Sequence, residues 1–340
     1  MVVLGTYNMS FAGDMFKENM PKFPSEYSFH MRDKARPRTF WNNALKHLKH
    51  FIEIKKPLAV GLQEMNLTND VSKGGTSAVE DMLKDIEGYK LYSDEIVVNE
   101  NVKPAVSLIV NVEAGEIKEG DIKIVDNPTQ KGRPILMALT DKNILLVSMH
   151  GMQTPTNGRD YEAFDKDMKD NNKEKLEELV KEFVGDKTVE KAYIMGDFND
   201  RYDSIKEFNF GFGDAKYEGE SPASCCHNWD SMGHDENLEA ISNQPEDKNY
   251  KQGNVPEKSE GKETIKIEIP KEHGITVADY INKGDKVFAY PKSGELKIYN
   301  CEHNLDDEGV SKASDHELVY MEITDTGAEE TGAEETGADA

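Results

Sequence analysis

Eight short apolar runs, each four to six residues long, are the feature that most constrains how this chain can fold. They are Val2–Tyr7, Leu58–Leu62, Val106–Val110, Ile135–Leu139, Ile144–Val147, Ala192–Met195, Val287–Tyr290 and Leu318–Met321. Runs of this length are typical of β-strands. The three runs at 106–110, 135–139 and 144–147 follow one another with no helical pattern between them. The sequence therefore predicts that part of the sheet is antiparallel.

Helical patterns lie between other runs. Apolar residues at helical spacing occur over 41–52 and end before Pro57, and similar stripes cover 79–86 and 176–183, the last followed by Gly185. Strands and helices mixed in this order favour an α/β sandwich over a purely parallel, doubly wound sheet.

The composition divides the chain into one large domain and an acidic tail. Residues 1–322 carry the apolar runs, interrupted by a segment at 209–275 that is rich in polar residues and glycine and is expected to be a loop-rich insertion. Residues 323–340 contain the repeat TGAEE-TGAEE-TGADA and are expected to be a disordered tail. The formal net charge of −24 disfavours broad, non-specific binding to nucleic acid.

Several features indicate a soluble intracellular protein. No stretch approaches the ~18 apolar residues that cross a bilayer, and the N-terminus lacks the basic region of a secretory signal. Three cysteines cannot build a disulfide framework, and their spacing with nearby histidines matches no standard zinc pattern. The oligomeric state is left open by the sequence.

Polar side chains suited to metal or phosphate chemistry stand at the ends of six of the apolar runs. Those that follow a run are Asn8, Glu64, His150, Asp197 and Asn199, and those that precede one are Asp285, Asp315 and His316. The ends of neighbouring strands can share one sheet edge, so these side chains are expected to converge on one cleft.

Three carboxylates in such a cleft, those of Glu64, Asp197 and Asp315, would be costly unless protonated or neutralised by a cation. Oxygen ligands of this kind suit Mg²⁺ or Mn²⁺, with substrate phosphate completing the coordination. The imidazoles of His150 and His316 could donate to phosphate oxygens or take a proton from water. The set contains no strong covalent nucleophile and favours direct attack by water on phosphorus.

These residues lie in motifs that resemble those of the endonuclease/exonuclease/phosphatase superfamily, whose members have the deoxyribonuclease I-like fold. The matching pieces, in the family's order, are TYN (6–8), GLQE (61–64), SMH (148–150), GDFND (196–200), GDKVFAY (284–290) and SDH (314–316). The resemblance implies a four-layer α/β sandwich, in which two packed mixed β-sheets are flanked by helices. It also implies a phosphoesterase that depends on Mg²⁺ or Mn²⁺.

The resemblance assigns a role to each motif residue. Glu64 would be the principal metal ligand, with Asn8 and Asp315 completing the metal site. Each residue also has a structural alternative, since Asp and Asn favour turns and caps as well.

In the same way, Asp197 would position or activate the attacking water, with Asn199 beside it on the phosphate. His150 would contact the scissile phosphate. Asp285 would pair with His316, which would act as a general base or as a phosphate stabiliser, and the resemblance leaves these two roles open.

The chain departs from the family pattern at two places. The usual Asn-x-His-Leu is Ser148-Met149-His150-Gly151 here, and the usual Asp-Arg-Ile/Val-Leu is Asp285-Lys286-Val287-Phe288. Lysine keeps the charge of the arginine that it replaces but lacks the planar fork of hydrogen-bond donors.

A basic stretch at 22–56, which follows Asn8, provides candidate substrate-binding residues. Arg36 and Arg38 could clamp additional phosphates, and Arg201 follows GDFND closely enough to touch one. The alternative for the stretch is a solvated helix face.

Three functions remain open at this stage. The first is a phosphatase acting on small or lipid-linked phosphates such as inositol phosphates, because GDFNDR resembles a segment of inositol polyphosphate 5-phosphatases. The second is a nuclease or a nucleic-acid end-processing phosphodiesterase, which needs nearly the same catalytic groups. The third is a non-catalytic scaffold, which predicts the loss of an expected ligand, whereas every expected ligand is present in the sequence.

Overall fold

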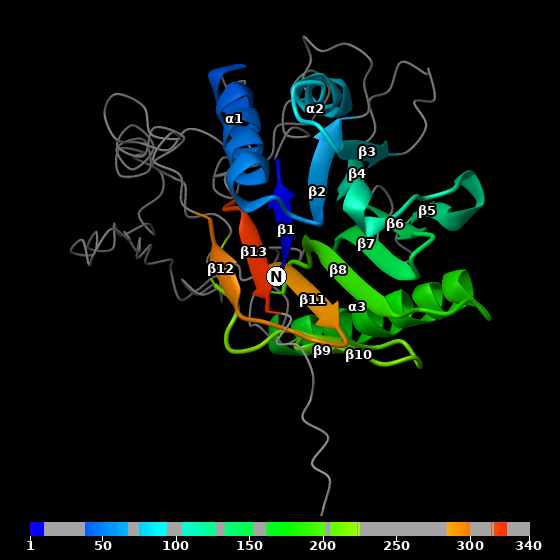
Figure 1. Cartoon of the computed structure of the whole chain (residues 1–340). Helices are drawn as coiled ribbons and strands as arrows, with labels where there is room; N and C mark the ends of the chain where they lie inside the picture. Colours follow the sequence, from blue (N-terminus) through cyan, green and yellow to red (C-terminus); the bar gives the residue numbers. More distant parts are fainter. Residues whose placement is uncertain are drawn as a thin grey trace, which may run out of the picture.

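The computed structural model describes residues 1–9, 38–66, 75–93, 104–126, 133–151, 161–200, 205–222, 224, 284–299, 314 and 316–324. Within these ranges it gives only the backbone for residues 38–43, 66, 104–105, 126 and 161–172. The described chain forms two mixed β-sheets with α-helices on their outer sides (Figure 1).

The first sheet has six strands in the order β12-β13-β1-β2-β4-β3. Their bounds are Val2–Asn8 for β1, Ala59–Asn66 for β2, Tyr89–Ser93 for β3, Pro104–Asn111 for β4, Leu296–Ile298 for β12 and Val319–Ile323 for β13. Strands β1 and β2 are parallel, and the other neighbours in this sheet are antiparallel.

The second sheet has seven strands in the order β5-β6-β7-β8-β11-β10-β9. Their bounds are Ile122–Asp126 for β5, Pro134–Leu139 for β6, Ile144–His150 for β7, Lys191–Asp197 for β8, Glu207–Asn209 for β9, Asp214–Lys216 for β10 and Asp285–Tyr290 for β11. It also contains one parallel pair, β7 with β8, among antiparallel neighbours.

The elements stack in four layers (Figure 1). Helices α1 (Arg38–Lys55) and α2 (Gly75–Leu83) cover the outer face of the first sheet, and α3 (Tyr161–Val184) covers the second. The main core lies between the sheets, where alternate residues of the facing strands are apolar and buried, such as Leu108 and Leu146. Two short 3₁₀ turns, Val112–Ala114 and Glu119–Asp121, lead from β4 to β5. The four-layer sandwich expected from the sequence is confirmed.

All eight apolar runs form strands, and each of the three helical stripes lies in or overlaps a helix. The sequence did not predict the five short strands β3, β5, β9, β10 and β12, which lie at or next to the sheet edges. A strand at an edge has fewer neighbours to pack against, so it needs few apolar residues and leaves a weak pattern. Among the described helices, none is both long and apolar enough to cross a membrane.

Two boundaries expected from composition differ in the structure. Residues 209–222, expected to begin the loop-rich insertion, contribute to β9 and β10 and bury Phe210, Ala215 and Tyr217 in the core. Ile323, expected to begin the tail, is buried in β13 and pairs with Val2. Both were missed because isolated apolar residues in a polar segment leave no run. Residues 223, 225–275 and 325–340 lie outside the described residues.

Candidate active site

The candidate active site lies where the two parallel strand pairs end. Parallel strands bring their carboxyl ends to one edge of a sheet, and Asn8 ends β1 while Asp197 ends β8. The amide nitrogen of Asn8 donates to Oδ2 of Asp197 over 3.1 Å, so these ends meet across the two sheets. Both side chains are buried. The sandwich thus places polar groups from both sheets at one end of its core.

Strand register places two further polar residues beside Asp197. His150 pairs with Asp197 across the parallel β7–β8 ladder, and Asp285 pairs with it across the antiparallel β8–β11 ladder. A continuous row of titratable side chains therefore crosses three neighbouring strands. Ligand atoms of Asp197, Asp285 and His316 all lie within 4.8 Å of one another.

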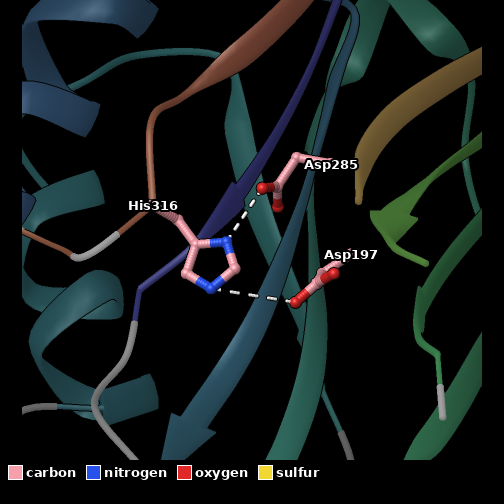
Figure 2. A group of neighbouring side chains, drawn as sticks. All are labelled: Asp197, Asp285 and His316. Atoms are coloured by element: carbon pink, nitrogen blue, oxygen red, sulfur yellow. Dashed lines mark hydrogen bonds and ion pairs between the residues drawn. The ribbon is translucent and has the colours of Figure 1, made fainter. Parts of the chain in front are cut away.

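His316 is held by a carboxylate, as the sequence predicted. Its Nδ1 lies 2.8 Å from Oδ2 of Asp285, and its Nε2 points toward Oδ2 of Asp197 at 3.8 Å (Figure 2). A carboxylate at Nδ1 fixes the tautomer that carries the proton on that nitrogen and raises the basicity of Nε2. The ring therefore presents Nε2 to the interior of the site.

Two serines support this Asp–His pair. Ser224 donates its hydroxyl to Oδ2 of Asp285 at 2.7 Å, the same oxygen that faces the imidazole. Ser314 accepts the backbone N–H of His316 at 3.1 Å and donates its hydroxyl to the carbonyl of Asn8 at 2.6 Å. The segment before β13 is thereby joined to the end of β1, which fixes where the histidine enters the site.

Asp197 has an unfavourable electrostatic environment. Burial raises the pKa of its carboxyl, and the negative charge of Asp285 raises it further, whereas His316, Arg133 and the backbone N–H of Asn199 lower it. That N–H donates to Oδ1 over 2.9 Å. Burial beside the charge of Asp285 thus disfavours the ionised form of this carboxyl, a cost that a nearby cation would reduce.

Glu64 reaches the site because of a backbone irregularity. The pairing of β2 with β4 shifts register between Leu62 and Met65, and Glu64 has a left-handed backbone with φ of 52°. A β-bulge of this kind turns a side chain out of the regular alternation. Oε1 of Glu64 lies 3.6 Å from Nε2 of His150. The carboxylate is 24% exposed and is thus the more accessible of the acids that meet His150.

His150 is buried with one ring nitrogen directed at the acids. Its Nε2 lies 3.6 Å from both Glu64 and Asp197 and has no hydrogen-bond partner among the described residues. Burial lowers the pKa of His150 well below its ordinary value, and the charges of Arg133 and His316 lower it further. The imidazole is therefore neutral at physiological pH and offers an unpartnered nitrogen to the site.

The loop after β8 carries a second backbone irregularity. Asn199 has a left-handed backbone with φ of 51°, and its side-chain nitrogen donates to the carbonyl of Gly151 at 3.2 Å. A Cβ at Gly151 would lie 2.5 Å from the carbonyl oxygen of Phe198. Only glycine therefore allows the end of β7 to approach the loop this closely.

Arg133 belongs to the site although the sequence analysis did not name it. It immediately precedes β6, which runs antiparallel to β7, so its position matches the end of β7 near His150. One guanidinium nitrogen donates to the carbonyl of Gly151. Burial lowers the pKa of Arg133, while the negative charges of Glu64 and Asp197 raise it. The signal in the sequence that could have identified it is an arginine just before the apolar run that forms β6.

Four of the predicted residues cannot be located at side-chain level. Asp315, Arg36 and Arg201 lie outside the described residues, and only the backbone of Arg38 is described, at the first position of α1. Their expected roles in metal and substrate binding remain predictions. The other seven, Asn8, Glu64, His150, Asp197, Asn199, Asp285 and His316, lie at one end of the sandwich in the network of contacts given above.

Comparison with known proteins gives similarity in fold. A scan against protein-family models finds no match, and neither does a search of curated proteins. The chain is similar to the solved structure of TDP2 from Caenorhabditis elegans, with 12% identity, a TM-score of 0.49, and coverage of 95% of this chain and 74% of that one.

Two bacterial structures are similar to the same degree. A mannosyl-6-phosphatase from Bacteroides thetaiotaomicron has 11% identity and a TM-score of 0.49, covering 95% of this chain and 100% of that one. An endonuclease/exonuclease/phosphatase family protein from the same organism has 12% identity and a TM-score of 0.49, covering 95% and 94%.

Proposed function

We propose that this chain hydrolyses phosphate esters with the help of Mg²⁺ or Mn²⁺ and uses water as the nucleophile. The observation that carries the proposal is the arrangement of Asp197 between His150 and the Asp285–His316 pair at the strand ends. A neutral imidazole, a carboxylate-held imidazole and buried acids at one place are the groups that a general-base hydrolysis requires.

The orientation of His316 supports attack by water. In a serine hydrolase triad the histidine turns Nε2 toward a serine hydroxyl. Here Nε2 faces Asp197 at 3.8 Å, and the serine in the group, Ser224, contacts the aspartate on the opposite side of the ring. A water that contacts both His316 and Asp197 would be oriented by the two groups and could lose its proton to either.

The other side of the site provides donors for a phosphate. His150 presents its Nε2, and Arg133 supplies a positive charge close to Glu64 and Asp197. Charge-assisted hydrogen bonds from such groups to phosphoryl oxygens strengthen as negative charge develops in the transition state. Asn199 is held by the hydrogen bond from its side chain to the carbonyl of Gly151, the same carbonyl that accepts from Arg133.

The donor set fits a hard divalent cation. Glu64 and Asn8 provide a carboxylate and an amide oxygen, and Asp315 would complete the set as the sequence resemblance implies. The ionised form of Asp197 is disfavoured because the carboxyl is buried beside Asp285, and a nearby positive charge would reduce that cost. When bound, such a cation supplies charge neutralisation for the phosphoryl oxygens.

The substrate that we favour is a small or lipid-linked phosphate such as an inositol phosphate. The formal charge of −24 opposes long-range attraction of a polyanion, whereas a local set of cations can still hold a small phosphate. The test has two alternative outcomes. The same groups could hydrolyse nucleic acid, or the protein could be a scaffold that binds without turnover.

A hydrolysis assay tests the proposal. Inositol phosphates, phosphoinositides and single- and double-stranded DNA and RNA are compared with Mg²⁺, with Mn²⁺ and with chelator. Asp197→Asn is expected to lower turnover by about 10²–10⁴-fold. Asp186→Asn, the same change at an exposed position, is the matched control.

Release of phosphate from small substrates that is lost with chelator would support the proposal. Cleavage of nucleic acid alone would mean that the substrate is nucleic acid and not a small phosphate. Activity retained in Asp197→Asn would refute the proposed mechanism.

A further inference from the structure

A buried ion pair lies directly behind the candidate active site. Lys286 follows Asp285 in β11, and because side chains alternate along a strand it points to the opposite face of the sheet. The lysine is fully buried, and its Nζ forms a salt bridge with Asp200, which is also buried. This pair joins the strand that carries one site aspartate to the loop that follows the other.

The same pair also contacts the backbone of Ile205, the next described residue after Asp200. Oδ2 of Asp200 accepts the backbone N–H of Ile205 over 2.6 Å, and Nζ of Lys286 donates to the carbonyl of Ile205 over 3.3 Å. Nζ also lies 5.6 Å from the centre of the Tyr217 ring. We call Lys286 and Asp200, with the backbone of Ile205, the clasp.

The residues just before the clasp include Asp197 and Asn199 of the site, and Asn199 has an unfavourable backbone conformation. Asp197 ends β8, Phe198 donates its N–H to the carbonyl of Gly284 at 2.7 Å, and Asn199 has its left-handed backbone directly before Asp200. A non-glycine residue in this region costs energy and persists only where its surroundings hold it. The clasp secures the residue immediately after this strained position.

Burying an ion pair is a poor way to gain stability. Removing two charges from water costs about as much as their attraction returns, and packed apolar side chains often do as well. The pair instead fixes the distance between Asp200 and β11. Because Asp200 follows Asn199 and β11 begins at Asp285, it also fixes how Asp197 and Asn199 lie relative to Asp285.

We propose that the clasp is a positioning device, which holds Asp197 and Asn199 against the Asp285–His316 pair from the outer face of the sheet. The inference rests on the proposed function, because positioning is defined by the reaction that it serves. Lys286 and Asp200 touch no reacting group in this account. They act through the backbone of the loop.

The test removes the charge of the lysine and keeps most of its length. Lys286→Met is compared with Lys297→Met, in which a 45% exposed lysine loses its salt bridge to Glu322. A displacement of about 1 Å costs about 10²-fold in rate. We therefore expect Lys286→Met to lower kcat about 10²-fold, with KM changed less than about threefold. Lys286→Arg should restore kcat to within about threefold of the unmodified chain, because it returns the charge.

A second measurement does not depend on activity. Amide hydrogen exchange of residues 196–200 should be faster in Lys286→Met than in Lys297→Met, because the loop loses its anchor. If Lys286→Met does not fold, the double variant Asp200→Asn with Lys286→Met leaves no buried charge unpaired, and the amide can still accept the N–H of Ile205.

The outcomes separate the two proposals. A folded Lys286→Met or double variant with an unchanged kcat overturns the clasp as a positioning device, and so does unchanged amide exchange in this loop. An unmodified chain with no hydrolytic activity refutes the proposed function instead, and the exchange measurement then still decides whether the clasp holds the loop.

Discussion

Replacing Asp197 with asparagine is expected to stabilise the metal-free protein and to lower its activity by about 10²–10⁴-fold. Burial and the charge of Asp285 raise the pKa of Asp197, so its ionised form is disfavoured in the folded state. A carboxyl whose pKa is higher in the folded state favours folding at low pH, and this contribution is lost as pH rises through the folded pKa. The unmodified protein should therefore lose stability from about pH 4 upward, to an extent that the variant does not.

The magnitude follows from the geometry of the group. Ligand atoms of Asp197 and Asp285 lie within 4.8 Å. At an effective dielectric constant of 20, two unit charges at this distance repel by about 3.5 kcal/mol. The new amide would face the nitrogen of Asn8 in place of an accepting oxygen, which costs about 1 kcal/mol. With the lost attraction to Arg133 and His316, a net increase of about 1–2 kcal/mol in the free energy of unfolding is expected at pH 8.

The assay is denaturant unfolding in the presence of chelator at pH 5 and pH 8, with Asp186→Asn as the exposed control. The difference in the free energy of unfolding between the variant and the unmodified protein should be larger at pH 8. Turnover with Mg²⁺ should fall by about 10²–10⁴-fold, the range for loss of a general acid–base group. A variant that is less stable at pH 8, or a difference that does not depend on pH, would refute the electrostatic reasoning.

Three further substitutions address other parts of the site. Asp285→Asn removes the carboxylate that holds the second histidine and should lower kcat by about 10²–10⁴-fold, which a full pH–rate profile would measure. Arg133→Met keeps the stem but removes a charge that lowers the pKa of His150, so NMR titration should show that pKa rising, while kcat/KM falls about 10²-fold. Gly151→Ala places a Cβ 2.5 Å from the carbonyl of Phe198 and should cost about 1–3 kcal/mol of unfolding free energy in a denaturant titration, with kcat reduced as the loop shifts.

Local patterns were sufficient to predict the centre of the fold. The strands β1, β2, β7 and β8 are buried and apolar, so they appear as runs in the sequence. The outer strands have weak patterns, and the apolar residues of α3 are interrupted, with none between Met168 and Leu176. These elements are selected by what they pack against, which a single sequence does not display.

The site was predictable to the extent that it follows from strand ends. The Asp285–His316 contact and the meeting of Asn8 with Asp197 agree with the expectation that the polar residues converge. The bulge at Glu64 was not predictable, because register shifts depend on the partner strand. Identifying Arg133 required the pairing of β6 with β7. The family resemblance indicated that Lys286 replaces an arginine, but it did not identify the partner, Asp200.

Unfavourable backbone angles and perturbed pKa values are concentrated at this one end of the sandwich. The described residues contain four non-glycine positions with positive φ, of which Lys56 directly follows α1 and Asn143 lies in the turn before β7, where such angles are common. The other two, Glu64 and Asn199, serve no helix end or hairpin and both lie in the site. They adjoin a carboxyl with a raised pKa and a histidine with a lowered one. A fold selected for stability alone would have removed these costs, so their concentration at the strand ends supports the proposal that this end is the functional site.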